Sequence, residues 1–151
     1  MSEPVEEKRE PLPIAVRVKW IDGLRFVASD EKGHSIVMDV SRGHGGQGSG
    51  FGPMQLLLVA FGGCTGVDLV ELLGKQRQRL EDLEIKVSGE RVRDPPRVYG
   101  GVHVEYVLKG ENLKDRAVRR AIRLSQEKLC SVGATLRAKA KVSYDYSIQQ
   151  G

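Results

Sequence analysis

A long apolar segment, 53–75, constrains the fold of this chain more than any other feature. Pro53 suits the first helical turn, Gly74 lies near the end, and apolar residues fill the turns between them. These residues surround the helix axis instead of forming one stripe, so the helix must be buried on most sides. We therefore predict one long core helix over 53–75, part of whose burial comes from a second copy of the chain.

The same segment is not expected to cross a membrane. Three glycines and Asp68 interrupt the apolar run before it reaches the roughly 20 residues that a bilayer crossing needs. The first residues, 1–12, are charged and contain prolines, so they do not form the apolar core of a secretory signal. We expect a flexible arm over 1–12 and a cytoplasmic protein.

Hydrophobic periodicity elsewhere predicts an α+β fold. The 151 residues are 40% apolar, which suffices for one core, so we expect a single domain over 13–151. An antiparallel meander comes first, then the long helix, a hairpin, two helices and a last strand. The ranges are 14–20, 25–29 and 35–40 for the meander, 83–87 and 102–108 for the hairpin, 112–129 (capped by Asn112) and 131–139 for the helices, and 142–148 for the last strand.

A glycine-rich stretch, 41–52, precedes the long helix. Residues 43–48 match the GxGxxG pattern of dinucleotide-binding folds, but the helix begins only near Pro53. No acidic residue ends a second parallel strand about 20 positions later. We therefore expect no nucleotide cofactor, and interpret the stretch as a mobile connection or a rim over the functional site.

The two cysteines, Cys64 and Cys130, are the candidate reactive groups. In a reducing compartment a lone pair of thiols is more often redox-active, metal-binding or inert than a structural disulfide. No histidine lies at a spacing that would complete a metal site, so we expect no metal. If the fold brings the two thiols together, the pair can cycle between dithiol and disulfide.

Each cysteine has two interpretations. Gly62 and Gly63, which precede Cys64, either leave room for a substrate beside the sulfur or allow a tight helix crossing. Cys130 stands before a helix, where the helix dipole would make its thiol easier to ionise. Alternatively, Cys130 is a small buried apolar residue at a helix junction.

The segments Gly52–Asp68 and Leu129–Val132 resemble the OsmC/Ohr superfamily of organic hydroperoxide reductases, and its YhfA-like branch in particular. The resemblance covers nearly everything after the charged arm. It implies an intertwined homodimer in which an antiparallel sheet wraps around the long central helix, with the active sites at the subunit interface.

The resemblance also implies a mechanism. Cys64 would attack the terminal oxygen of an organic hydroperoxide, giving a sulfenic acid and an alcohol. Cys130 would then form a disulfide with Cys64, which an external dithiol, lipoyl-type in relatives, would reduce.

The groups that would activate Cys64 depart from the family pattern. Ohr proteins use an arginine that is oriented by a glutamate. The position that matches this glutamate is Met54 here, and Gln55 lies beside it. We expect Arg25 to supply the cation, with Arg42 as the alternative. Asp68, one turn after Cys64 on the same face, could orient an arginine or a water, but its charge alone would raise a thiol pKa.

Two other functions remain possible from the sequence. One is an OsmC-like redox protein or sensor with weak peroxidase activity. The other is a polyanion-binding module such as an RNA binder, because the net charge is +4. The cations are spread along the chain and no aromatic-rich RNA-recognition strand is present, so this function is disfavoured.

Overall fold

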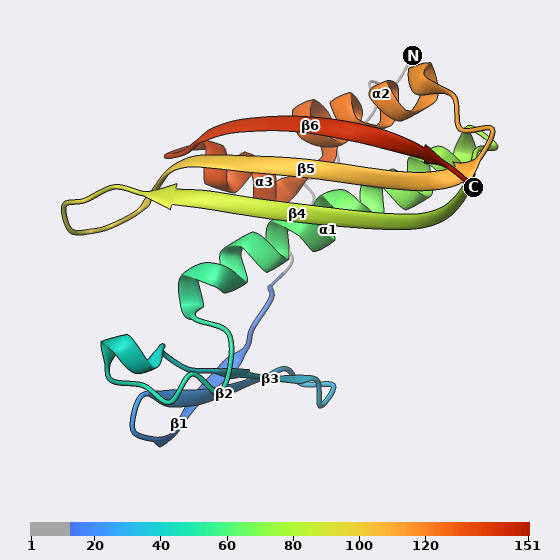
Figure 1. Ribbon diagram of the computed structural model, residues 1–151. Helices are drawn as coiled ribbons and strands as arrows, with labels where there is room; N and C mark the ends of the chain where they lie inside the picture. The colour runs from blue at the N-terminus through green and yellow to red at the C-terminus, as the bar shows by residue number, and fades with distance from the viewer. Residues whose placement is uncertain (1–12) are drawn as a thin grey trace, which may run out of the picture. The chain divides into compact units, whose positions relative to one another are not determined.

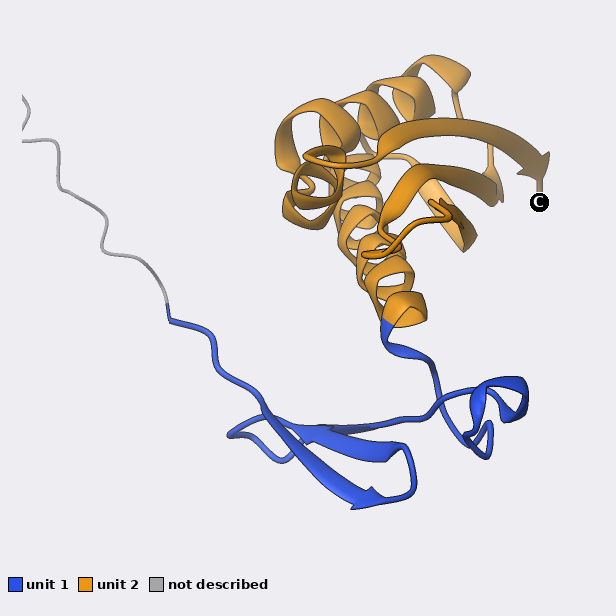
Figure 2. Cartoon of the chain, turned by 90° about the vertical axis from the view of Figure 1, so that its left-hand side faces the viewer, with its two compact units in different colours: residues 1–53 blue, residues 54–151 orange. Residues whose placement is uncertain are grey.

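The computed structural model describes residues 13–151, so the expected arm over 1–12 lies outside the described residues. The chain divides into two compact units that meet between Pro53 and Met54 (Figure 2). Each unit contains one three-stranded sheet. The expected α+β class is confirmed, and the single domain over 13–151 stays a prediction.

The N-terminal unit is the expected antiparallel meander. It consists of β1 (Arg17–Asp22), β2 (Arg25–Ser29) and β3 (Ser35–Met38), with β2 in the middle. Val27 of β2 pairs with Lys19 on one side and with Val37 on the other. A single 3₁₀ turn, η1 (Arg42–His44), follows within the glycine-rich stretch.

The glycine-rich stretch is a packed turn around the carboxylate of Asp39, in contrast to the mobile connection that was one of two expectations; the other, a rim over the functional site, stays a prediction. This carboxylate accepts hydrogen bonds from the Ser49 hydroxyl at 2.7 Å and from the backbone N–H groups of Val40, Gln47 and Ser49. A Cβ on Gly46 would lie 1.9 Å from the Val40 oxygen, so only glycine allows the backbones to approach this closely. The glycines of this turn therefore serve local packing.

The C-terminal unit places three helices on one face of a sheet (Figure 1). The sheet has the order β4 (Arg79–Arg91), β5 (Tyr99–Glu111), β6 (Lys141–Gln150), and the helices are α1 (Pro53–Lys75), α2 (Asp115–Leu124) and α3 (Ser131–Arg137). β4 and β5 pair antiparallel, but β6 runs parallel to β5. The expected antiparallel sheet is thus mixed in this unit, because the helices between β5 and β6 carry the chain back to the starting end of β5.

Helix α1 begins and ends where the sequence predicts, at Pro53 and Lys75. Its buried residues recur every four positions: Phe61, Thr65, Leu69 and Leu73. The apolar members of this stripe form a core with β5 and α2, to which Val104, Leu108, Val118 and Ile122 contribute.

The opposite face of α1 is apolar but open in the single chain. Val59, Val67 and Val70 are 48%, 60% and 56% exposed. By length and composition α1 also meets the criteria for a membrane-spanning helix, with a mean hydropathy of 1.9, as the core helices of soluble proteins can. The single chain therefore buries one stripe of α1, not most of its sides.

The helix expected over 112–129 is shorter and changes its pitch. Asn112 has a φ of 55°, so it turns the chain after β5 and does not cap a helix. Asparagine tolerates this left-handed conformation better than most residues. α2 begins at Asp115, and its last turn continues into a π-helical turn, η2 (Ser125–Leu129), directly before Cys130.

Candidate functional site

The fold of the C-terminal unit brings the two cysteines together. Cys64 lies in the middle of α1, and Cys130 lies between η2 and α3. The two side chains are close enough for Cys64 to raise the pKa of the Cys130 thiol, and both are free thiols. Cys130 is 3% exposed, whereas Cys64 is half-buried. Of the two thiols, Cys64 is therefore the one that solvent reaches more easily.

The π-helical turn and the start of α3 hold Cys130 in place. The N–H of Cys130 donates to the carbonyl of Ser125 at 2.8 Å, which closes η2. Its sulfur is the N-cap of α3 and accepts a hydrogen bond from the N–H of Gly133 at 3.3 Å. Single π-helical turns of this kind are frequent at functional sites.

Gly133 permits this arrangement because it has no side chain. A Cβ at this position would lie 2.7 Å from the ring of Phe61 and 3.3 Å from the sulfur of Cys130. The first of these distances is too short for two carbon atoms in contact. Gly133 therefore lets α3 approach α1 closely enough for the two cysteines to meet.

The electrostatic environment keeps the Cys130 thiol protonated. Burial, with smaller contributions from Cys64 and Asp68, raises the pKa of Cys130 to about 11, although the N–H of Gly133 acts in the opposite direction. Of the two interpretations of Cys130, easier ionisation at the helix start is therefore wrong, and a small buried residue at a helix junction is confirmed. Loss of hydration outweighs the single favourable N–H group.

A buried chain of hydroxyl groups leads away from the cysteines. The Thr65 hydroxyl lies 2.7 Å from both the Tyr106 and the Ser125 hydroxyls. Ser125 donates in turn to a carboxylate oxygen of Asp68 at 2.8 Å. Tyr106 also accepts from the Gln126 amide at 2.5 Å, and Gln126 accepts from Arg137. The chain ties α1, β5 and η2 together next to the two sulfurs.

The sequence analysis did not identify Thr65, Ser125 and Tyr106 as members of this network. One signal was present, because Thr65 and Ser125 are hydroxyl residues on otherwise apolar helix faces. Buried hydroxyls need partners, so such positions indicate a polar contact inside the core. Asp68, in contrast, lies where the sequence placed it, one turn beyond Cys64, and its charge acts on Cys130.

The glycines near Cys64 have different surroundings. A Cβ on Gly62 would lie 3.3 Å from Val87, and one on Gly66 would lie 3.2 Å from Ile85, so both allow α1 to pack tightly on β4. A Cβ on Gly63 would meet nothing within 4 Å. Close helix packing therefore explains Gly62, while Gly63 leaves space on the exposed face of α1.

The other expected site residues belong to other parts of the chain. Arg25 belongs to the N-terminal unit, where its guanidinium binds Asp22 through two hydrogen bonds of 2.9 and 2.5 Å. Arg42, also in that unit, donates to the carbonyl of Gln47 at 3.3 Å. Gln55 is exposed in the first turn of α1, and the backbone carbonyl of Met54 accepts from the Tyr99 hydroxyl. The roles of Arg25 and Gln55 stay predictions.

A metal site is not formed by the described residues, 13–151. They contain no group of three or more His, Cys, Asp or Glu side chains that could hold a metal ion. The chemistry that this part of the chain offers is that of two adjacent thiols, one half-buried and one held protonated, beside a carboxylate.

The chain is similar to proteins that are already known. Protein YhfA of Escherichia coli K12 is 38% identical over 132 residues, covering 87% of this chain and 96% of YhfA. A crystal structure of a hypothetical protein from Aquifex aeolicus VF5 is 29% identical, with a TM-score of 0.76 over 91% of this chain and 99% of that one.

A more distant structure shares the fold. It is an organic hydroperoxide resistance protein OsmC from Legionella pneumophila, 17% identical, with a TM-score of 0.67 over 91% of this chain and 99% of that one. The family described as OsmC-like protein matches residues 46–145, which include both cysteines. This chain therefore belongs to the OsmC-like family.

Proposed function

We propose that this protein is a thiol-dependent peroxidase that reduces organic hydroperoxides to alcohols in the cytoplasm. The observation that carries the proposal is the proximity of Cys130 and Cys64, two thiols from distant parts of the chain that interact electrostatically. Family membership adds support, because OsmC-like structures include organic hydroperoxide resistance proteins.

In the first step the Cys64 thiolate attacks the terminal oxygen of the hydroperoxide. The O–O bond breaks, a sulfenic acid forms on Cys64, and the alkoxide takes up a proton to leave as the alcohol. Cys64 is the attacking residue in this scheme because it is half-buried, whereas Cys130 is buried and protonated. The apolar residues around the site favour organic hydroperoxides over hydrogen peroxide.

In the second step Cys130 attacks the sulfur of the sulfenic acid. The new S–S bond displaces hydroxide, which leaves as water with the proton of the Cys130 thiol. An external dithiol, such as a lipoyl group, then reduces the disulfide by thiol exchange and becomes a cyclic disulfide. No resident cofactor is needed.

The proposed roles of the remaining residues follow from their chemistry. Asp68 is close enough to raise the pKa of Cys130, so it can accept the proton of this thiol and pass it to the departing hydroxide, which leaves as water. Arg25, or alternatively Arg42, would supply the cation that stabilises the Cys64 thiolate and the alkoxide. Gln55 would orient the substrate or this cation through its amide.

The proposed protein is a homodimer with its sites at the subunit interface. The open face of α1, with Val59, Val67 and Val70 exposed, supports this part of the proposal. A patch of this kind on a soluble protein marks an interaction site. Sedimentation at micromolar concentration tests it, and a stable monomer would contradict the dimer.

A peroxidase assay with cumene hydroperoxide and a dithiol tests the activity. Wild type should turn over, Cys64→Ser should not react, and Cys130→Ser should react once and stop as a sulfenic acid. Ser131→Ala, next to Cys130 but without a thiol, is the matched control and should keep wild-type turnover. Undiminished cycling of Cys130→Ser would contradict the resolving role.

The second candidate function is a redox protein or sensor with slow peroxidase turnover. Two observations favour it: the Cys130 thiol has a pKa of about 11, and Met54 stands where Ohr proteins have a glutamate. A sensor would form the disulfide with hydroperoxide but would turn over slowly with any dithiol. The assay described above separates the two functions.

A further inference from the structure

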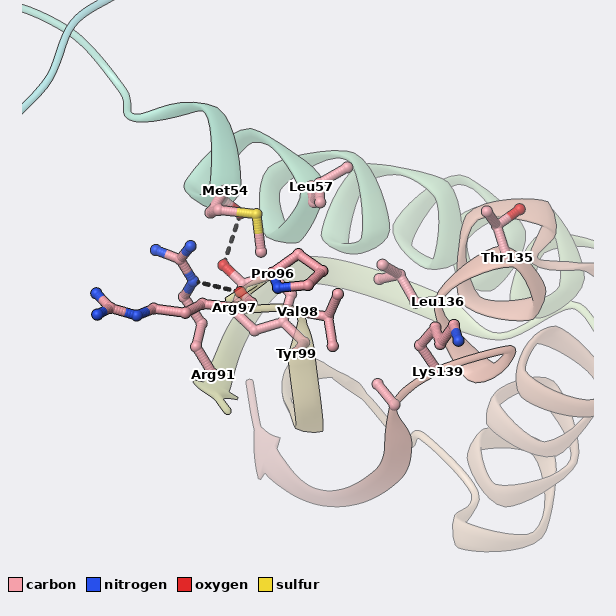
Figure 3. A pocket seen from close by; sticks show the side chains of 11 residues that line it. Met54, Leu57, Arg91, Pro96, Arg97, Val98, Tyr99, Thr135, Leu136 and Lys139 are labelled. Atoms are coloured by element: carbon pink, nitrogen blue, oxygen red, sulfur yellow. Dashed lines mark hydrogen bonds between the residues drawn. The ribbon is translucent and has the colours of Figure 1, made fainter. Parts of the chain in front are cut away.

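A pocket of about 330 Å³ lies in the C-terminal unit, apart from the cysteine pair (Figure 3). It opens between the start of α1, the loop that joins β4 to β5, and the end of α3. Neither cysteine lines it. Its lining residues are Met54, Leu57, Arg91, Pro96, Arg97, Val98, Tyr99, Thr135, Leu136, Lys139 and Ala140.

The interior of this pocket is apolar. Leu57, Val98 and Leu136 project into it together with Pro96 (Figure 3). The one aromatic hydroxyl in the lining, that of Tyr99, donates to the carbonyl of Met54 at 2.6 Å and so is already engaged. The apolar side chains can therefore pack against the hydrocarbon part of a ligand, and the volume of the pocket suits a small molecule.

The edge of the pocket is cationic. Arg91 and Lys139 lie toward opposite ends, and the guanidinium of Arg97 points away (Figure 3). No carboxylate lines the pocket, and within the described residues neither Arg91 nor Lys139 forms an ion pair. An apolar interior with uncompensated positive charge at its edge complements an anion with an apolar body.

The side chain of Arg91 is held in position for such an anion. Its Nε donates to the backbone carbonyl of Arg97 at 2.7 Å, which orients the guanidinium. The two terminal nitrogens are then available to a planar anionic group. A guanidinium matches the geometry of a carboxylate with two parallel hydrogen bonds.

We propose that this pocket binds a small amphipathic carboxylate, with the carboxylate on Arg91 and the hydrocarbon chain between Leu57, Val98 and Leu136. Lys139 adds to the positive potential that attracts the anion. The proposal is independent of the peroxidase activity, because neither cysteine lines the pocket.

Calorimetric titration of the full chain with octanoate tests the site, with octanol as the neutral ligand of equal chain length. Octanoate should bind at one site per chain and at least about tenfold more tightly than octanol, since hydrogen bonds to a charged group contribute about 1.5–3 kcal/mol. Added salt should weaken the binding of octanoate but not the binding of octanol. Equal affinity of the two ligands, or no saturable octanoate binding up to about 1 mM, would overturn the proposal.

Two variants locate the carboxylate. Arg91→Gln should lower the affinity for octanoate about tenfold and leave the affinity for octanol unchanged. Arg93→Gln removes an exposed cation of the same loop that does not line the pocket, so it should bind both ligands like wild type. Equal octanoate affinities of the two variants would overturn the assignment to Arg91. A thermal unfolding transition like that of wild type shows that each variant is folded. The difference between the octanoate and octanol affinities of wild type tests the proposal without either variant.

Discussion

The sulfur of Cys130 accepts a hydrogen bond from the backbone N–H of Gly133 at 3.3 Å, and Cys64 of α1 lies close enough to raise the pKa of the same thiol. One turn of chain therefore caps α3 and brings the second thiol to the first. Any change that shifts this turn should alter both the stability of α3 and the reactivity of the cysteine pair.

Gly133→Ala should destabilise the fold and slow disulfide formation. The new Cβ would lie 2.7 Å from the Phe61 ring, and overpacking of this kind costs about 1–3 kcal/mol. Gly74→Ala is the matched control, because a Cβ there meets nothing within 4 Å. It should stabilise α1 by up to about 1 kcal/mol. Urea unfolding measures both changes, and equal stability of Gly133→Ala and wild type would contradict the close approach.

Asp68→Asn should lower the pKa of the Cys130 thiol from its raised value. The carboxylate of Asp68 is one of the groups that raise this pKa, and the amide removes its negative charge. Alkylation of Cys130 by iodoacetamide, followed by mass spectrometry across a pH series, should therefore begin at lower pH in the variant.

Glu71→Gln is the control for this measurement. It removes an exposed carboxylate from the next turn of the same helix, so the alkylation profile should match that of wild type. If Asp68→Asn and Glu71→Gln give the same profile, the charge of Asp68 does not act on Cys130.

The sequence predicted those features that depend on neighbouring residues. Pro53, the apolar run and Gly74 indicate α1 locally, and its bounds were predicted to the residue. The contact between Cys64 and Cys130 was expected only through the family resemblance. Asn112 was misassigned because a good capping residue also tolerates a left-handed turn, and only its position after β5 decides between the two.

Features that depend on tertiary packing could not be predicted. Thr65 and Ser125 bond across the core from α1 to η2, and no local pattern indicates which partner each hydroxyl finds. The direction of the Cys130 pKa shift was left open between two interpretations for the same reason. The helix start is visible in the sequence, but the burial that outweighs it exists only in the folded chain.

Asp39 should make the glycine-rich turn sensitive to acid. Hydrogen bonds, first from the Ser49 hydroxyl, lower the pKa of Asp39 from 3.8 to about 2. Because the folded-state pKa is depressed, the stabilisation is complete above pH 3.8 and is lost as the pH falls toward about 2. Amide hydrogen exchange at Gln47 and Ser49 should show protection decreasing through this window.

Asp39→Asn tests the origin of that acid sensitivity. It should leave these two amides weakly protected at neutral pH and remove the dependence on pH between 3.8 and about 2. Glu31→Gln, an exposed carboxylate of the same unit, should behave like wild type. Unchanged protection in Asp39→Asn would show that the carboxylate does not organise the turn.

The most direct test of the proposed chemistry is a single oxidation followed by peptide mass spectrometry. Reduced protein treated with one equivalent of cumene hydroperoxide should lose both free thiols, release one equivalent of cumyl alcohol and yield a peptide pair joined by a Cys64–Cys130 disulfide. A dithiol should restore both thiols. Unchanged free thiols with intact hydroperoxide, or disulfides only between Cys64 residues of two chains, would contradict the proposal.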